Sequence, residues 1–275
     1  MYNKFLRGNI VTKKLGFALG SGGSRGVSHI GFLKAMEEEG IKPDFISGVS
    51  MGAVVGSCYA KGLTIERMIN IVKKLKPSDI FDFSLNPLGG ASLLRSQKMQ
   101  KKIKQFLGNV KFSELEIPFT CVATDVISGK KVLLGENKQD KVCEAVVASA
   151  SIPSIFKPVS KDNYFLVDGG VVQRVPIQEV RDMGATVVVA VDVLGEIRPC
   201  DKKYNIFTLL SRVFEITDNE ITEYKKKQQK SDLYLLPELG NMNQYKLKDI
   251  DFAIESGYKL GKENANKIKK LLAKE

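Results

Sequence analysis

The sequence predicts a layered α/β fold, in which short strands and helices alternate along most of the chain. Brief apolar runs stop at glycine-rich or polar turns, and segments with helical spacing of apolar residues follow them. The chain has 275 residues, 43% of them hydrophobic, so it is long enough to bury one large core. Because no segment has the composition of a linker, we expect a single domain over residues 1–275.

The amino-terminal part contains two units of a strand, a turn and a helix. The apolar run Leu15–Leu19 stops at the glycine-rich loop Gly20–Gly26, and the helical pattern that follows ends at Gly40. A second strand begins at Phe45, and after its turn a helical pattern of small and apolar residues ends at Gly62. Each turn is therefore expected to lie between a strand and a helix.

The remaining elements follow from apolar runs and from helical periodicity. Residues 64–108 have helical spacing at both ends, whereas their middle, 77–90, indicates an apolar loop or a packed connection. The motif-bearing core is thus expected over about 15–195, and a helical carboxyl-terminal part over about 205–275. The other expected elements are a hairpin of 119–126 and 131–134, a buried helix at 142–150, strands at 164–167 and 186–193, and lysine-rich helices at about 206–230 and 249–273 around the apolar run 233–236.

The chain is basic, with 42 Lys and Arg residues against 31 Asp and Glu residues and a formal net charge of +11. Such a balance can favour nucleic acid, an anionic membrane surface or an acidic substrate. We interpret the runs at Lys225–Lys227 and around Lys267, Lys269 and Lys270 first as solvated helix faces. Weak peripheral contact with an anionic membrane is the second interpretation. Nucleic acid is not expected as a partner, because the lysines are not interleaved with aromatic residues.

Cysteine and histidine usage argues against a metal site. The cysteines form no Cys-x-x-Cys pair and the chain has one histidine, so we expect reduced, structural thiols and no metal or cofactor. Residues 1–14 do not resemble a secretory signal, and no apolar run reaches the roughly 20 residues that cross a bilayer. A cytoplasmic protein is therefore expected, in one interpretation peripheral at the inner membrane face. The cysteines are Cys58, Cys121, Cys143 and Cys200.

The segment Gly48–Gly52 fits the pattern Gly-x-Ser-x-Gly, with Ser50 at its centre. A serine on a tight turn between a strand and a helix has a strained backbone, and the flanking glycines let the chain bend and the helix pack closely. Its hydroxyl then lies at a helix start, where backbone N–H groups favour developing negative charge. We therefore predict that Ser50 is a nucleophile.

A serine nucleophile needs a base, and here the base is expected to be a carboxylate. The one histidine, His29, precedes Ser50, and the order His, Ser, acid does not match the known orders of the Ser-His-Asp folds. His29 also lies on an expected helix one turn after the glycine loop, which favours a packing or hydrogen-bonding role. Several aspartates end or follow apolar strands and are candidate bases: Asp168, with Asp44, Asp125 and Asp192 as rivals.

Four sequence blocks between about Leu15 and Pro176 resemble those of patatin-like phospholipases of the bacterial type, in the order that this family has. The last hundred residues match no motif of the family. The resemblance implies a three-layer patatin-like α/β fold, with a central mixed, mostly parallel sheet flanked by helices. The blocks are Gly22-Gly23-Ser24-Arg25-Gly26, the serine turn 48–52, Ala148–Pro153 leading to Phe156–Pro158, and Asp168-Gly169-Gly170.

The resemblance also implies a serine acyl hydrolase that works through an acyl-enzyme with a Ser-Asp dyad. Ser50 would attack an ester carbonyl, and Asp168 would accept its proton. The substrate would be an acyl-ester lipid or a small ester, as in a lipid esterase, a lysophospholipase or a phospholipase A, while the oligomeric state stays open. Backbone N–H groups of Gly22, Gly23 and Ser24 would hold the oxyanion, and the motifs would be supported by Arg25, Gly26, Gly48, Gly52, Gly169 and Gly170.

Two other functions remain as alternatives. A strand, a glycine loop and a helix can bind a nucleotide phosphate, but Arg25 stands where the third glycine of Gly-x-Gly-x-x-Gly is required. A catalytically silent module could use the same fold to bind a membrane or a protein. Among hydrolase substrates, single-chain lipids and short esters are favoured, because no dedicated membrane domain is visible. The pocket size is expected to depend on residues 63–108.

Overall fold

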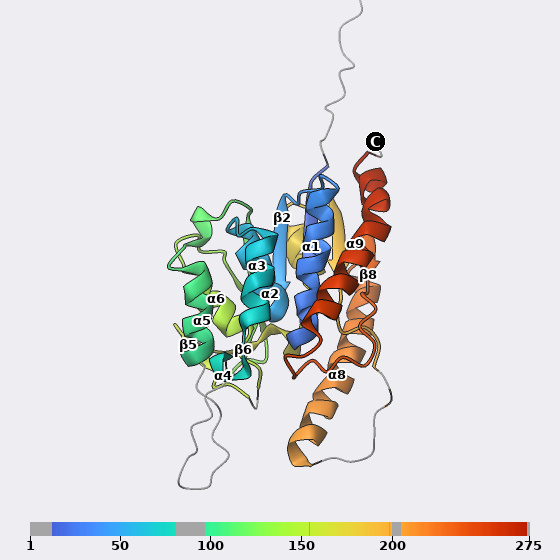
Figure 1. Ribbon diagram of the computed structural model, residues 1–275. Helices are drawn as coiled ribbons and strands as arrows, with labels where there is room; N and C mark the ends of the chain where they lie inside the picture. Colours follow the sequence, from blue (N-terminus) through green and yellow to red (C-terminus); the bar gives the residue numbers. More distant parts are fainter. Residues whose placement is uncertain (1–12, 81–96, 154, 198, 200–204, 274–275) are drawn as a thin grey trace, which may run out of the picture.

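The computed structural model describes residues 13–80, 97–153, 155–197, 199 and 205–273. Within these ranges a mixed sheet lies between layers of helices (Figure 1), which confirms the predicted α/β fold. The strand order in the sheet is β5-β6-β3-β2-β1-β7-β8, and β4 pairs with β3 off this path. The strands are β1 Leu15–Leu19, β2 Phe45–Val49, β3 Phe119–Asp125, β4 Lys131–Leu134, β5 Val159–Lys161, β6 Tyr164–Asp168, β7 Val187–Val191 and β8 Leu233–Leu235.

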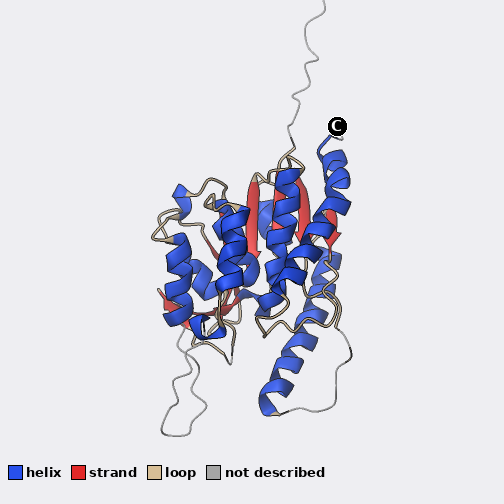
Figure 2. Cartoon of the chain, viewed as in Figure 1, coloured by secondary structure: helices blue, strands red, loops and turns tan. Residues whose placement is uncertain are grey.

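Helices connect many of these strands and cover the sheet, as Figure 2 shows. None of the helices in the described ranges combines the length and the apolar character that crossing a membrane requires. The α-helices of this part of the chain are α1 Ser28–Glu38, α2 Met51–Ala60, α3 Ile65–Lys74, α4 Pro77–Ile80, α5 Gln97–Leu107, α6 Val142–Ser149, α7 Ile177–Asp182, α8 Ile206–Gln228 and α9 Ile250–Ala273.

The centre of the sheet is parallel. β1 pairs in parallel with β2 and β7, and further parallel pairs join β2 to β3 and β7 to β8. Antiparallel pairs join β3 to β4 and β6, and β6 to β5. The strands β1, β2, β3, β7 and β8 therefore all end at one edge of the sheet, which we call the carboxyl edge. Ligands of open α/β sheets bind outside this edge.

Two apolar cores hold the sheet between its helices. β1 and β7 are buried along their whole length, as expected for central parallel strands that are covered on both faces. Phe17 of β1 packs edge-on against Phe32 of α1, with 5.2 Å between the ring centroids. The next residue, Ala18, belongs to a separate core with Val180 of α7. Successive strand residues thus serve opposite faces of the sheet.

Some local expectations differ from the structure. The short elements β5 and α7 were not predicted, because three and six residues are too few to show a periodicity. The expected loop at 77–90 begins instead with the helical turn α4, and its part after residue 80 lies outside the described residues, as does Cys200. Cys58, Cys121 and Cys143 are buried free thiols, as predicted.

The lysines of the last two helices differ in their surroundings. Lys267, Lys269 and Lys270 of α9 are exposed, in agreement with a solvated helix face. For Lys225 of α8 that interpretation is wrong. Its half-buried ammonium donates to the carbonyl of Val172, at 2.6 Å, and to the side chain of Gln173. Lys225 therefore anchors α8 to the chain that follows β6.

Helix α9 packs along α1 and so joins the carboxyl-terminal part to the motif-bearing core (Figure 1). Glycines allow the two backbones to approach closely. A Cβ atom at Gly257 would lie 1.9 Å from the carbonyl oxygen of Ser28, and one at Gly31 would lie 1.8 Å from that of Ile254. Neither position has room for a side chain.

We expect Gly257→Ala to lower the free energy of unfolding by about 1–3 kcal/mol, because the added methyl group would push α9 away from α1. Helix propensity alone acts in the opposite direction, since alanine is favoured over glycine by about 1 kcal/mol in a helix interior. Urea unfolding measures the difference. Lys259→Ala, at an exposed position of the same helix, is the control and should change stability by less than about 0.5 kcal/mol. A more stable Gly257→Ala protein would contradict the close packing.

Candidate active site

Ser50 lies on a sharp turn between β2 and α2. Its backbone has φ 53° and ψ −120°, a conformation that costs free energy for a residue with a side chain. The flanking glycines are required by close approaches. A Cβ atom at Gly48 would lie 2.5 Å from the carbonyl oxygen of Gly52, and one at Gly52 would lie 2.2 Å from that of Leu19. The turn is secured by the N–H of Ser50, which donates to Oγ of Ser149 at 3.1 Å.

The structure brings Asp168, the last residue of β6, next to Ser50. The two side chains lie close enough for the Ser50 hydroxyl to affect the pKa of Asp168, and they are 5% and 4% exposed, respectively. The Asp168 carboxylate also accepts the N–H of Gly170 at 2.7 Å. Its backbone is held on both sides, because its N–H donates to the carbonyl of Ser151 at 2.9 Å and its carbonyl accepts the hydroxyl of Thr124 at 3.0 Å. Both main-chain and side-chain contacts therefore fix the carboxylate.

Burial changes the acidity of this carboxylate. It raises the pKa of Asp168 from about 3.8 to about 6, because a charged group loses the solvation of water. The Ser50 hydroxyl and the hydrogen bond from the N–H of Gly170 oppose this rise, and the nearby Asp218 adds to it. A carboxylate with such a pKa is ionised near neutral pH and is more basic than an exposed aspartate. It is therefore suited to accept a proton from a hydroxyl.

The glycine loop after β1 passes beside this pair of residues. Gly23 has φ 52°, and a Cβ atom there would lie 2.2 Å from the carbonyl oxygen of Gln244. That same carbonyl accepts the N–H of Ser24 at 2.9 Å, so this N–H is not free for an oxyanion. The N–H groups of Gly22 and Gly23 make no hydrogen bond to another described residue. The geometry thus reduces the expected oxyanion donors from three to these two.

The other members of the motifs have packing roles. The N–H of Arg25 donates to the carbonyl of Gly22 at 3.1 Å, and its own carbonyl accepts the hydroxyl of Ser28 at 2.8 Å, so its backbone shapes the loop. At the remaining motif glycines a Cβ atom would meet a neighbouring atom within 3.0 Å. These glycines are Gly26 against Met51, Gly169 against the backbone of Val122, and Gly170 against Ser21.

His29 supports the glycine loop from within the core. It is fully buried, and its Nε2 atom lies 2.8 Å from the carbonyl oxygen of Gly20. Burial lowers the pKa of His29 to about 4, so the ring is neutral near pH 7 and donates to that carbonyl through Nε2. This arrangement matches the predicted packing and hydrogen-bonding role.

The rival aspartates are engaged elsewhere. Asp125 closes the β3–β4 turn and accepts hydrogen bonds from the hydroxyl of Ser128, at 2.6 Å, and from the N–H of Phe165, at 3.0 Å. Asp44 accepts the N–H of Leu15 at 2.7 Å. Asp192 pairs with Arg174 at 3.3 Å. Among the four candidate bases, Asp168 is the one whose carboxyl group interacts with Ser50.

Ser50 opens into an apolar cavity of about 180 Å³. The predicted contribution of residues 63–108 is confirmed, because α3 and α5 form much of the wall. A loop before α9 completes the lining, and no sequence motif identified this loop. The wall is formed by Val54, Val55 and Cys58 of α2, Met68, Ile71 and Val72 of α3, Met99, Ile103 and Phe106 of α5, Ile152 and Phe156 after α6, and Gln244, Tyr245 and Leu247 of the loop.

Residues 17–181, more than half of the chain, match the sequence profile of the family described as Patatin-like phospholipase. The chain belongs to the patatin-like phospholipase family. Family membership agrees with the resemblance that the glycine, serine and aspartate motifs indicated.

Relatives of this patatin-like chain include larger proteins. An uncharacterized NTE family protein of Mycobacterium tuberculosis is 34% identical over 182 residues, which cover 66% of this chain and 49% of the relative. Lysophospholipase NTE1 of Coccidioides immitis is 26% identical over 284 residues, covering 94% of this chain and 18% of the relative. The chain thus spans about half of the first relative and less of the second. The solved structure of VipD from Legionella pneumophila shares the fold, with a TM-score of 0.56, 13% identity and coverage of 93% and 67% of the two chains.

Asp168→Asn is expected to stabilise the protein above the pKa of the carboxyl group. The folded-state pKa of about 6 exceeds the unfolded value, so ionisation of Asp168 lowers stability by about 2–3 kcal/mol as the pH rises from about 4 to about 6. Asparagine keeps an oxygen for the N–H of Gly170 and carries no charge. Thermal unfolding should therefore show a higher Tm for the variant at about pH 8 and little difference near pH 4.

Asp125→Asn is the matched control, and its expected change in Tm at about pH 8 has the opposite sign. Hydrogen bonds from Ser128 and from the N–H of Phe165 lower the pKa of Asp125 to about 2. Its ionised form therefore contributes stability that is lost as the pH falls, and asparagine should lower the Tm at about pH 8. A lower Tm for Asp168→Asn under the same conditions would show that burial does not disfavour the charge of Asp168.

Proposed function

We propose that this protein is a serine acyl hydrolase that cleaves acyl esters of lipids through an acyl-enzyme. The observation that carries the proposal is the buried, adjacent pair of Ser50 and Asp168 at an apolar cavity. Membership of a family described as phospholipases supports a lipid substrate. A relative named as a lysophospholipase supports the same substrate class.

In the proposed reaction, Oγ of Ser50 attacks the ester carbonyl while Asp168 accepts the hydroxyl proton. The N–H groups of Gly22 and Gly23 stabilise the negative charge on the carbonyl oxygen, and one such donor contributes about 3 kcal/mol. Asp168 then gives the proton to the departing alcohol, which leaves an acyl group on Ser50. The same carboxylate activates a water molecule that attacks the acyl-enzyme and releases the fatty acid. Histidine has no part in these steps.

The cavity favours a substrate with one acyl chain near the nucleophile. Its wall is mainly aliphatic and aromatic, so a hydrocarbon chain in it would be removed from water. Polar groups of the wall lie at Ser50 itself and at residues such as Lys102 and Gln244. We propose single-chain lipids and small esters as the preferred substrates.

Ser50→Ala and Asp168→Asn are each expected to lower kcat/KM for p-nitrophenyl butyrate by about a thousandfold or more, because each removes one half of the dyad. Circular dichroism should show both variants folded. In the unaltered protein, log kcat/KM should rise with pH below about 6 and level off above it, since the ionised carboxylate accepts the proton.

A catalytically silent module is the alternative function. It would leave the unaltered, folded protein inactive on p-nitrophenyl esters of any chain length and on lysophospholipids. Activity that survives Asp168→Asn with an unchanged pH profile would instead show that another group is the base.

The assignment of the cavity as the acyl site can be tested with a substitution that shortens the cavity. Cys58 lies two turns along α2 from Ser50 and lines the wall, so Cys58→Leu should fill the far part of the cavity. We expect the ratio of activity on a dodecanoyl ester to that on a butanoyl ester to fall about tenfold, because butanoyl does not reach Cys58. Cys143→Leu is the control, since Cys143 is buried outside the cavity lining. An equal change of the ratio in both variants would contradict the assigned acyl site.

A further inference from the structure

Helix α8 is amphipathic in an inverted sense. Over its first three turns six large apolar side chains face solvent, whereas an ordinary surface helix buries its apolar stripe. Their exposed fractions run from 43% to 63%, which is high for such large side chains in one helix. We call this set the α8 face: Ile206, Leu209, Leu210, Val213, Phe214 and Ile216.

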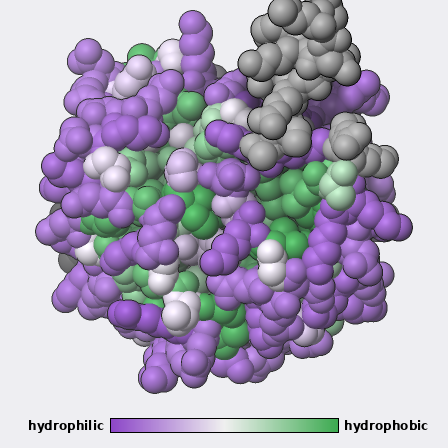
Figure 3. Space-filling view, turned by 90° about the horizontal axis from the view of Figure 1, so that it is seen from above, coloured by the Kyte–Doolittle hydropathy of each residue, from purple (hydrophilic) through white to green (hydrophobic). Residues whose placement is uncertain are grey.

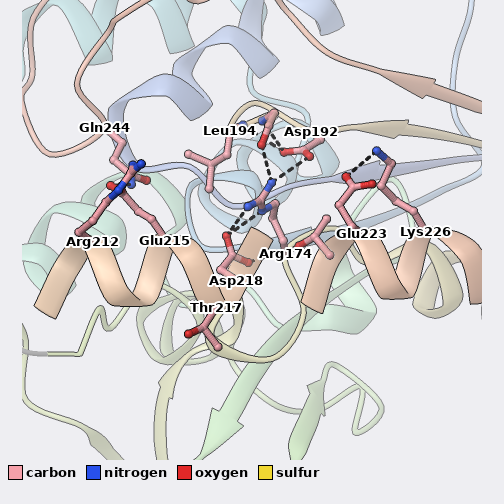
Figure 4. Close-up of polar contacts among 12 residues, drawn as sticks. Arg174, Asp192, Leu194, Arg212, Glu215, Thr217, Asp218, Glu223, Lys226 and Gln244 are labelled. Carbon is pink, nitrogen blue, oxygen red and sulfur yellow. Dashed lines mark hydrogen bonds and ion pairs between the residues drawn. The ribbon is translucent and has the colours of Figure 1, made fainter. Parts of the chain in front are cut away.

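Polar contacts hold α8 in this orientation. Asp218 of α8 pairs at 2.7 Å with Arg174, which is itself buried and also pairs with Asp192. One turn earlier, Glu215 accepts a hydrogen bond from Gln244 at 2.9 Å. Figure 4 shows Glu215 and Asp218 on the side of the helix that faces Gln244 and Arg174, while Thr217 points to the opposite side. Turning the α8 face inward would break these contacts and leave Arg174 without its partner on α8, at a cost that buried charges make high.

The α8 face lies beside the mouth of the acyl cavity. The amino-terminal turns of α8 project past the carboxyl edge of the sheet (Figure 1), which is the edge where Ser50 follows β2. Gln244, which α8 holds through Glu215, lines the cavity together with Tyr245. Tyr245 is itself 40% exposed, so the apolar surface continues from α8 toward the mouth.

A second exposed apolar group lies at the other end of the same edge. Val126 and Ile127, at the tip of the β3–β4 turn, are 54% and 74% exposed. Tyr164 and Phe165, at the start of β6, lie next to this tip, because β6 runs antiparallel to β3. We call these four residues the hairpin tip. In the strand order, β2 lies between the strands β3 and β6, which carry the hairpin tip, and the strands β7 and β8. Helix α8 lies on the β7–β8 side, because Lys226 packs over the ring of Tyr234 in β8 and Arg174 joins Asp218 to Asp192, the residue after β7.

Basic residues accompany both apolar groups. Lys130 is exposed in the turn that carries the hairpin tip, and Lys246 and Lys248 are exposed next to Tyr245. The whole chain has a formal net charge of +11. Figure 3 shows the opposite end of the molecule, where hydrophilic residues dominate and apolar areas lie between them. Exposed apolar side chains with lysines beside them are typical of segments that bind an anionic lipid surface.

We propose that the α8 face and the hairpin tip dock this protein on an anionic lipid bilayer, with the mouth of the acyl cavity toward the lipid. This docking proposal rests on the proposed lipid hydrolase function, because that function identifies the cavity as the acyl site. A protein partner or a second copy of the chain would best cover one continuous apolar area. The two groups instead lie toward opposite ends of the carboxyl edge, with the Ser50 turn on a strand between them, which favours an extended lipid surface over a single complementary patch.

Vesicle sedimentation tests the docking surface without turnover when it is performed in the Ser50→Ala background. The probe is a vesicle of phosphatidylglycerol and phosphatidylcholine, compared with one of phosphatidylcholine alone. The double variant Leu210→Glu/Val213→Glu adds two charges to the α8 face, and it should lower the partition coefficient on anionic vesicles about tenfold or more. Ile127→Glu should lower it by a smaller factor. All proteins should bind the neutral vesicles more weakly.

Tyr224→Glu/Gln228→Glu is the matched control. It adds the same two charges to exposed positions of α8, but about 20 Å further along the helix axis from the mouth. The control should partition like the parent protein. On soluble p-nitrophenyl butyrate, both double variants in the Ser50 background should keep the parent kcat/KM, whereas on lysophospholipid in anionic vesicles only the α8-face variant should lose activity, again about tenfold.

Three outcomes would overturn the docking proposal. The first is that the Ser50→Ala protein without surface substitutions does not bind anionic vesicles. The second is an equal loss of binding in the α8-face variant and the control. The third is a dimer in size-exclusion chromatography that Leu210→Glu/Val213→Glu converts to a monomer without any change in vesicle binding, which would assign the α8 face to a second copy of the chain. A protein that binds vesicles yet hydrolyses no ester would leave docking intact and refute the proposed hydrolase instead.

Discussion

The close approach of Ser50 and Asp168 is the contact around which the site is arranged, and both residues are nearly inaccessible to water. The single histidine of the chain is committed to the carbonyl of Gly20 and is neutral, so it leaves the carboxylate as the neighbour able to accept a proton. Each residue of the pair ends or follows a strand, β6 for Asp168 and β2 for Ser50, and β3 lies between these strands in the sheet. The sheet thereby fixes the separation of the two side chains.

In the proposed hydrolase, this arrangement lowers stability in favour of reactivity. A strained backbone at Ser50 and a buried carboxylate at Asp168 both raise the free energy of the folded state. Close packing elsewhere offsets these costs, as in the fully buried strands β1 and β7 and at the contact of α1 with α9. An enzyme site commonly concentrates such locally unfavourable features, because pre-organised groups need little rearrangement during the reaction.

The carboxyl-terminal part matters to the site although it carries no family motif. Gln244 is the link: its carbonyl holds Ser24 of the glycine loop, and its side chain binds Glu215 of α8. Arg174 forms a second link, since its carbonyl accepts the N–H of Ser21 while its guanidinium pairs with Asp218 of α8. The glycine loop is therefore braced by α8 and by the loop before α9. The same contacts turn the apolar side of α8 outward.

Much of the fold and the turn that carries Ser50 could be predicted from the sequence, because they depend on short-range patterns. Glycines at close approaches, as at Gly48 and Gly52, belong to a turn whose geometry is local. Long-range pairings could not be predicted. The partner of the Ser24 amide is 220 residues away along the chain, and the partner of Lys225 lies beyond its own helix. Periodicity marked α8 as amphipathic, but the outward direction of its apolar side depends on Arg174, a residue in another segment.

The dyad is tested most directly by locating the serine that reacts with a fluorophosphonate, using mass spectrometry of the intact protein and of its peptides. A single adduct is expected on the peptide that contains Ser50, with labelling slowed strongly by Asp168→Asn in a folded sample. An adduct on another residue, no adduct at all, or an unchanged rate in Asp168→Asn would contradict the assignment of Ser50 as a nucleophile activated by Asp168.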